Sequence, residues 1–114
     1  MIILDKPYVS EFLKETIKNL NIPVVQTKTA LSFLNNSGQD FISENEAIKR
    51  IQEKDDTLVY TNSENAVNWV EKNLPDSDLN RRIKLFKNKV FFRDLIRDLY
   101  PNYFYHEVSF EDLI

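Results

Sequence analysis

The sequence predicts an α/β doubly wound domain, in which helices flank an open, mainly parallel sheet of about four strands. Short apolar segments alternate with amphipathic segments of about ten residues, which is the pattern of repeated βαβ units. The stretches "SENEAIKRI" and "SENAVNWV" start twenty residues apart, and each follows an apolar segment. The same helix start therefore recurs after two strands. A chain of 114 residues is long enough for one such domain with its own core.

The four predicted strands are short and apolar. They are "MIIL" at residues 1–4, "IPVVQ" at 22–26, "DFI" at 40–42 and "TLVY" at 57–60. Pro23 stands near the start of the second strand, where its missing N–H costs least. Farther along, "YFYHEV" at 103–108 alternates enough to predict another strand.

A helix is expected after each of the four strands. Ser10 is the predicted N-cap of the first, Gly38 follows the end of the second at 30–36, and Ser43 with Glu46 has capping-box spacing at the start of the third. The fourth helix follows "TNSEN". Two further apolar stripes before Pro101 predict two more helices, and "SFEDLI" is typical of an N-cap and the first turn of a helix. The expected inner faces are Phe12, Leu13, Thr16, Ile17 and Leu20; Ala47, Ile48 and Ile51; Ala66, Val67, Trp69, Val70 and Leu74; Leu79, Ile83 and Phe86; and Phe92, Leu95, Ile96 and Leu99.

Composition excludes several functional classes. Gly38 is the single glycine, so neither a Rossmann glycine fingerprint nor a P-loop can form. One histidine and no cysteine leave little material for a zinc site or a nucleophile, and we assign no catalytic residue and no metal ligand. A net charge of −3 predicts no bulk attraction to nucleic acid or to a membrane surface. The start shows no secretory signal, and the expected compartment is the cytoplasm.

Ligands of an open parallel sheet bind beyond the carboxyl ends of its strands. Three polar stretches are expected at that edge: "DKPYVS", "QTKT" and "TNSEN". Serine, threonine and asparagine are also the residues that cap helices, and exposed charges are commonly only solvated, so both interpretations stay open. The candidate substrate-side residues are Asp5, Lys6, Thr61, Asn62, Ser63 and Glu64.

Other conspicuous residues have structural explanations. Trp69 lies on an apolar stripe, which favours core packing over ligand stacking. The basic run at 81–89 is interrupted on both sides by acidic residues, which indicates a solvated helix face rather than a nucleic-acid site. An aromatic cluster is expected to be buried against a neighbouring layer; its members are Tyr100, Tyr103, Phe104 and Tyr105.

Three blocks carry a resemblance to a known family. In order, "LDKPYVSEFLKETI", "YTNSENAVNWVEKNL" and "FKNKVFFRDLIRDLYPNYFYHEV" resemble the amino-terminal region of ATP-grasp proteins, notably those labelled as similar to the large subunit of carbamoyl-phosphate synthase. The resemblance implies a Rossmann-like pre-ATP-grasp domain without a glycine fingerprint at 1–76. It also implies a helical linker and the start of the ATP-binding domain at 77–114. Lys89 matches the linker lysine that reaches ATP phosphates, with Asn88 where aspartate is usual and Arg93 one turn on.

The same resemblance implies a function for the parent protein. It would be a carboxylate–amine or carboxylate–thiol ligase that uses ATP and magnesium to form an acylphosphate. This chain, which stops near the start of a helix, is then expected to be a fragment without activity or tightly bound cofactor. Its partners would be the missing ATP-grasp domain or a second copy. The alternatives are a stand-alone α/β module that binds a partner or metabolite, and a nucleotide-binding regulatory domain, which the missing glycines disfavour.

Overall fold

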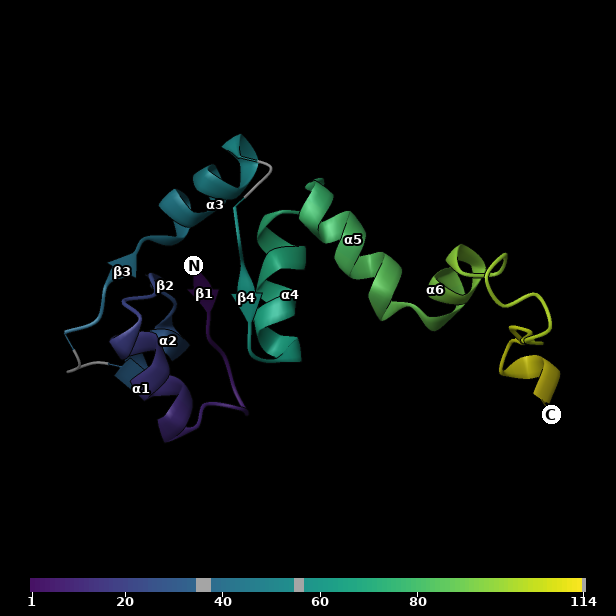
Figure 1. Ribbon diagram of the computed structural model, residues 1–114, viewed down its shortest axis with the longest axis horizontal. Helices are drawn as coiled ribbons and strands as arrows, with labels where there is room; N and C mark the ends of the chain where they lie inside the picture. Colours follow the sequence, from purple (N-terminus) through teal and green to yellow (C-terminus); the bar gives the residue numbers. More distant parts are fainter. Residues whose placement is uncertain (35–37, 55–56, 114) are drawn as a thin grey trace.

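The sheet is the expected one. The computed structural model describes residues 1–34, 38–54 and 57–113. Strands β1 (Ile2–Ile3), β2 (Val24–Val25), β3 (Phe41–Ile42) and β4 (Tyr60–Thr61) form an open parallel sheet in the order β3-β2-β1-β4 (Figure 1). The α/β Rossmann-like class predicted from the sequence is thereby confirmed. The strand at 103–108 is not formed.

Helices cover both faces of the sheet. Their bounds are α1 Glu11–Asn19, α2 Lys28–Leu34, α3 Glu44–Glu53, α4 Glu64–Asn73, α5 Asp78–Lys87 and α6 Lys89–Leu95, with a 3₁₀ turn η1 at Glu111–Leu113. Successive side chains of a strand point to opposite faces. Ile2 therefore packs with Ile17 of α1 and Ala30 of α2, whereas Ile3 packs with the buried residues of α3 and α4.

Serine caps set the helix starts. The hydroxyls of Ser10, Ser43 and Ser63 accept hydrogen bonds from the third residue of α1, α3 and α4 respectively, as their positions predicted. Glu46 does not close the capping box on Ser43, because its carboxylate accepts from Arg50 Nε at 2.8 Å. Gly38 has a φ of 64°, which suits glycine, but the predicted end of the second helix at 35–36 lies outside the described residues.

Three of the predicted helix faces are too wide. Phe12 is 79% exposed and Leu20 is 66% exposed, although Ile17 between them is fully buried. The strands contain two residues each, so the sheet offers α1 little more than one helical turn of apolar surface, which α1 shares with α2. On α5, Leu79 and Ile83 pack against the core while Phe86 is exposed, and the stripe of the sixth predicted helix leaves Leu95 and Leu99 exposed.

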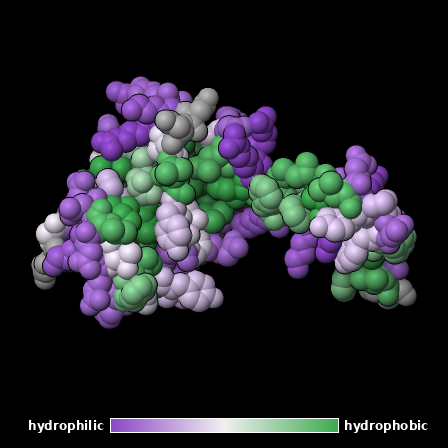
Figure 2. Space-filling model, viewed as in Figure 1, coloured by the Kyte–Doolittle hydropathy of each residue, from purple (hydrophilic) through white to green (hydrophobic). Residues whose placement is uncertain are grey.

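The end of the chain projects from this core. We call residues 84–113 the C-terminal arm. The molecule measures 52 × 32 × 26 Å with a radius of gyration of 17.7 Å, compared with about 13 Å for a compact chain of this length. Figure 2 shows apolar surface along the arm. The expected burial of the aromatic cluster is wrong, because the large exposed apolar residues here are Phe86, Phe91, Leu95, Leu99, Tyr100, Tyr103, Phe104, Val108, Phe110 and Leu113.

The segment at 103–108 forms neither strand nor helix, and no strand of the described residues pairs with it. Its tyrosines bind α6 instead: the Arg93 guanidinium lies 4.1 Å from the centre of the Tyr103 ring, and the Tyr105 hydroxyl donates to Asp94. The alternating pattern predicted that Tyr103 and Tyr105 point to the same side of a strand. Both tyrosines instead contact polar side chains of α6. Within the described residues, no helix is long and apolar enough to cross a membrane. The predicted domain boundary at 76/77 stays a prediction.

Asn80 should be the polar residue on which the α4–α5 turn depends. Its side chain is 1% exposed, and its Nδ2 donates to the Pro75 carbonyl at 2.7 Å. We expect Asn80→Ala to lower the free energy of unfolding by about 1–3 kcal/mol, because the Pro75 carbonyl loses its donor and the buried amide leaves a cavity. Urea denaturation measures the change, with the exposed Asn19→Ala as matched control; equal effects of the two variants would contradict this role.

Candidate functional site

The structure brings the predicted substrate-side residues together. In the order β3-β2-β1-β4, the chain leaves β1 toward α1 on one face and leaves β4 toward α4 on the other. The point between β1 and β4 is thus the topological switch point, where such sheets bind ligands. "DKPYVS" follows β1 and "TNSEN" spans the end of β4 and the start of α4, so Asp5 and Lys6 lie beside residues 61–64.

Asn62 joins these two segments through its side chain. Its Oδ1 accepts from the Asp5 backbone N–H at 2.8 Å, and its Nδ2 donates to the carbonyls of Asp5 and Tyr8, each at 2.8 Å. These three bonds connect residues 57 and 54 positions apart in the chain. The amide is therefore committed to holding the loop after β1.

Ser63 and Asn65 extend the same connection. The Ser63 hydroxyl caps α4 at the Ala66 N–H and donates to the Asp5 carbonyl, with both distances 3.2 Å. Asn65 Nδ2 donates to the Lys6 carbonyl at 3.0 Å. The "TNSEN" turn is thus a helix cap and, in addition, a clamp on the neighbouring loop. Asn65 was missed as a site residue; an asparagine two positions after the capping serine, in the first turn of the helix, was the available signal.

The charged members of the edge remain at the surface. Asp5 Oδ1 accepts from the next backbone N–H, that of Lys6, at 2.7 Å, and the Lys6 side chain is exposed. Glu64 is directed to α5 rather than to Asp5, since its carboxylate lies 3.4 Å from Lys87 Nζ. Among the described residues, no three histidine or acidic side chains are grouped so that they could hold a metal ion.

Lys87 connects the end of α5 to α4. Its Nζ lies 3.4 Å from each of three acceptors: the Glu64 carboxylate, the Glu71 carboxylate and Asn68 Oδ1. Desolvation lowers the pKa of Lys87, but the Glu71 and Glu64 carboxylates outweigh it and raise that pKa above its ordinary value. Sequence reasoning treated Lys87 as part of a solvated face. The missed signal was the spacing of the acceptors, one and two turns apart on one side of α4.

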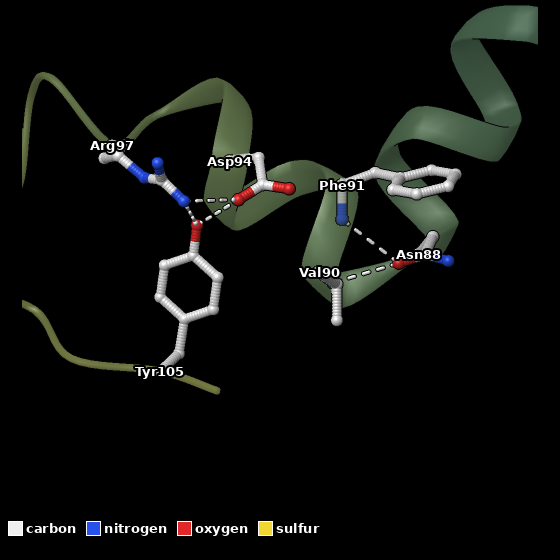
Figure 3. Close-up of polar contacts among 6 residues, drawn as sticks. All are labelled: Asn88, Val90, Phe91, Asp94, Arg97 and Tyr105. Carbon is white, nitrogen blue, oxygen red and sulfur yellow. Dashed lines mark hydrogen bonds and ion pairs between the residues drawn. The ribbon is translucent and has the colours of Figure 1, made fainter. Parts of the chain in front are cut away.

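Lys89 opens α6 with an exposed side chain. The preceding Asn88 caps this helix, its Oδ1 accepting from the N–H groups of Val90 at 2.9 Å and Phe91 at 3.1 Å (Figure 3). Asparagine therefore caps α6 with a neutral side chain. An anion at this helix start would meet the Lys89 ammonium rather than those two N–H groups. Arg93 stacks on Tyr103 and does not orient Lys89.

A polar cluster ties the following coil to α6. Arg97 Nη2 donates to Asp94 Oδ1 at 3.0 Å and to the Tyr105 hydroxyl oxygen at 3.2 Å, while Tyr105 donates to Asp94 (Figure 3). On the other side, the Phe86 and Phe92 rings lie 5.5 Å apart and pack α6 on α5. Consequently the position of α6, and of the coil bound to it, depends on the position of the end of α5.

Of the hollows beside α5, two differ in their position relative to the predicted edge. One of about 550 Å³ lies at the amino ends of the strands, opposite the predicted edge. Lys54 and Arg82 are its cationic lining residues, and Arg82 is paired with Asp78 at 2.6 Å. The other, of about 390 Å³, is adjacent to Lys89. Its lining comes from α4, α5 and the start of α6, and consists of Glu71, Lys84, Lys87, Asn88 and Phe91.

The hydrogen bonds of Asn62 should contribute measurably to the free energy of unfolding. Asn62→Ala removes three hydrogen bonds and is expected to lower the free energy of unfolding by about 2–3 kcal/mol, at about 1 kcal/mol for each bond. Asn65→Ala removes one bond and serves as the matched variant, with a correspondingly smaller loss. Urea denaturation measures both. If Asn62→Ala costs no more than Asn65→Ala, the turn is not a clamp.

The Lys87 contact should weaken only in strong alkali. A folded-state pKa above the ordinary value means that the contact is fully present below pH 10.5 and is lost as pH rises through the folded pKa. Glu71→Gln should lower the titration midpoint of the Lys87 side chain, followed by NMR. Glu15→Gln, an exposed change on α1, should leave it unchanged. A midpoint that Glu71→Gln does not move would contradict the assignment.

Comparison with protein families, with curated proteins and with solved structures finds no match to this chain. The likeness to ATP-grasp proteins thus rests on the three sequence blocks described above. The activity, the bound nucleotide and the partners are accordingly matters of proposal.

Proposed function

We propose that this chain is the amino-terminal, substrate-side domain of an ATP-dependent carboxylate–amine or carboxylate–thiol ligase. The observation that carries the proposal is the position of Lys89. It follows directly on the α5 end that Lys87 holds beside the first turn of α4, at the carboxyl edge of an open parallel sheet. Lys89 is exposed and forms no ion pair within the described part of the chain, so its charge is available to a phosphate.

Lys89 would act as a point charge on the phosphates of ATP. In a ligase of this kind the substrate carboxylate takes the γ-phosphoryl group to form an acylphosphate, and ADP leaves. The amine or thiol then attacks the acyl carbon and displaces phosphate. Magnesium would screen the phosphates, and its ligands would lie in another part of the enzyme. This chain alone would bind neither ATP nor magnesium tightly, and we assign the enzyme to the cytoplasm.

The C-terminal arm supports a further domain in the same protein. It exposes a series of large apolar side chains, with Phe104 at 88% and Phe110 at 77%. Contiguous exposed apolar surface commonly marks an interaction site. In the proposal the ATP-binding domain covers this surface; an isolated chain would use it to form a homodimer.

One observation favours a second candidate, a non-catalytic α/β module that binds a protein partner through the arm. The side chains of Asn62 and Ser63 form hydrogen bonds with backbone groups of the loop after β1. A substrate at this edge would therefore be left to Asp5, Lys6 and Thr61, while the apolar arm would stay available to a partner.

Reading the coding sequence directly beyond the Ile114 codon separates the two candidates. The ligase proposal expects an open frame that encodes a glycine-rich loop and acidic metal ligands. A stop codon at that point would overturn it in favour of the partner-binding module.

In the whole enzyme, Lys89→Gln should raise the KM for ATP by about 10- to 100-fold, since a hydrogen bond to a charged group is worth roughly 1.5–3 kcal/mol. The exposed Lys72→Gln on α4 is the matched control and should leave the KM unchanged. Steady-state kinetics with ATP as the varied substrate measures both. Equal KM values for the two variants would remove Lys89 from the ATP site.

A further inference from the structure

The far end of α5 has few contacts with the core. Near its start, Leu79 and Ile83 pack against the buried residues of α4 and the sheet. Farther along, a hollow of about 390 Å³ is lined by residues of α4, α5 and the start of α6, and the Lys87 side chain reaches from α5 to α4. Figure 1 shows α5 leading away from the core toward α6. Since α6 packs on α5 through Phe86 and Phe92, whatever holds the end of α5 also places α6 and Lys89.

We infer that Lys87 is a positioning residue that fixes Lys89 relative to the "TNSEN" turn. Its ammonium bridges Glu64 in the first turn of α4 and Glu71 two turns on, at 3.4 Å each. Glu64 belongs to the substrate-side edge, whereas Lys89 belongs to the phosphate side. One cation therefore sets how the two halves of the site face each other. This inference rests on the proposed function and deepens it.

The chemistry of Lys87 suits this role. A lysine ammonium has three donors, and three acceptors converge on it from one side of α4: Glu64, Asn68 and Glu71. Exposed ion pairs usually add little to global stability. The ion pairs of Lys87 are nevertheless sufficient to favour one position of α5, because Leu79 and Ile83, which pack α5 against the core, lie nearer its start. Loss of Lys87 should therefore widen the range of arm positions without unfolding the domain.

The absence of cysteine allows a direct test in the isolated chain. Spin labels at Lys18→Cys on α1 and Asp98→Cys beyond α6 report the distance between the core and the arm. Lys87→Gln should broaden the distance distribution, while Lys87→Arg should keep it narrow. Lys84→Gln, one turn earlier on α5, is the matched control and should change nothing. An identical distribution in Lys87→Gln and Lys84→Gln would overturn the inference.

Kinetics of the whole enzyme supply a second readout. Lys87→Gln should reduce kcat/KM for ATP by about 10- to 100-fold, since misplacing a group by about 1 Å can cost up to about 100-fold. Lys87→Arg should restore most of it. In a Lys89→Gln background Lys87→Gln should have no further effect, because Lys87 acts through Lys89. Full additivity would overturn the inference.

The two hypotheses fail differently. If Lys89→Gln leaves ATP use unchanged, the proposed function fails, whatever the labels report. If Lys89→Gln impairs ATP use while Lys87→Gln changes neither kcat/KM nor the distance distribution, only the positioning role of Lys87 fails.

Discussion

Parallel pairing of β1 with β4 is the contact on which the rest of the molecule depends. It joins Ile2 to Tyr60 and Ile3 to Thr61, and so brings the first residues of the chain beside a strand more than fifty positions away. The register places the loop after β1 against the turn after β4, where Asn62 binds the backbone of Asp5. It also places α4, against which α5 packs. The site and the direction of the arm both follow from this pairing.

The sheet has a large effect for its size because both of its faces are buried. Each strand contributes two residues, and those of β1, β2 and β3 point to opposite helical layers, whereas Tyr60 of β4 is exposed. Helix residues therefore supply much of the core, and α1 reaches it over little more than one turn, through Leu13 and Ile17. This limit explains why α1 buries Ile17 and leaves Phe12 in solvent. It also explains why the arm, which begins beyond the last turn in contact with the sheet, keeps its apolar side chains exposed.

Some polar side chains in this region hold the backbone in place, and others remain exposed and can bind a ligand. Asn62, Ser63 and Asn65 bind backbone groups, and Asn88 caps α6. These amides and hydroxyls organise the loops from which the charged residues project. Lys6 and Lys89 are the exposed cations that this arrangement leaves near the two sides of the proposed site. In the proposed ligase, anions would therefore meet lysines that follow segments held by neutral side chains.

The sequence by itself determined the order of strands and helices, the parallel α/β class and the serine caps. These are local properties: apolar periodicity, β-branched runs and capping residues act within a few positions of the chain. The three helix-start serines were identified correctly for this reason. The sequence also placed "DKPYVS" and "TNSEN" at one edge, because the carboxyl ends of parallel strands must meet there.

Tertiary structure decided what the side chains at that edge do. Capping and ligand binding use the same residue types, so only the position of the Asp5 carbonyl beside Asn62 shows that the amide clamps a loop. The same holds for Lys87, whose partners lie on another helix, and for the segment at 103–108. The alternating apolar pattern predicted a strand there, but a strand requires a neighbouring strand to pair with. Tyr105 instead donates a hydrogen bond to Asp94 on α6. Such pairings depend on distances between remote residues, which local sequence pattern does not encode.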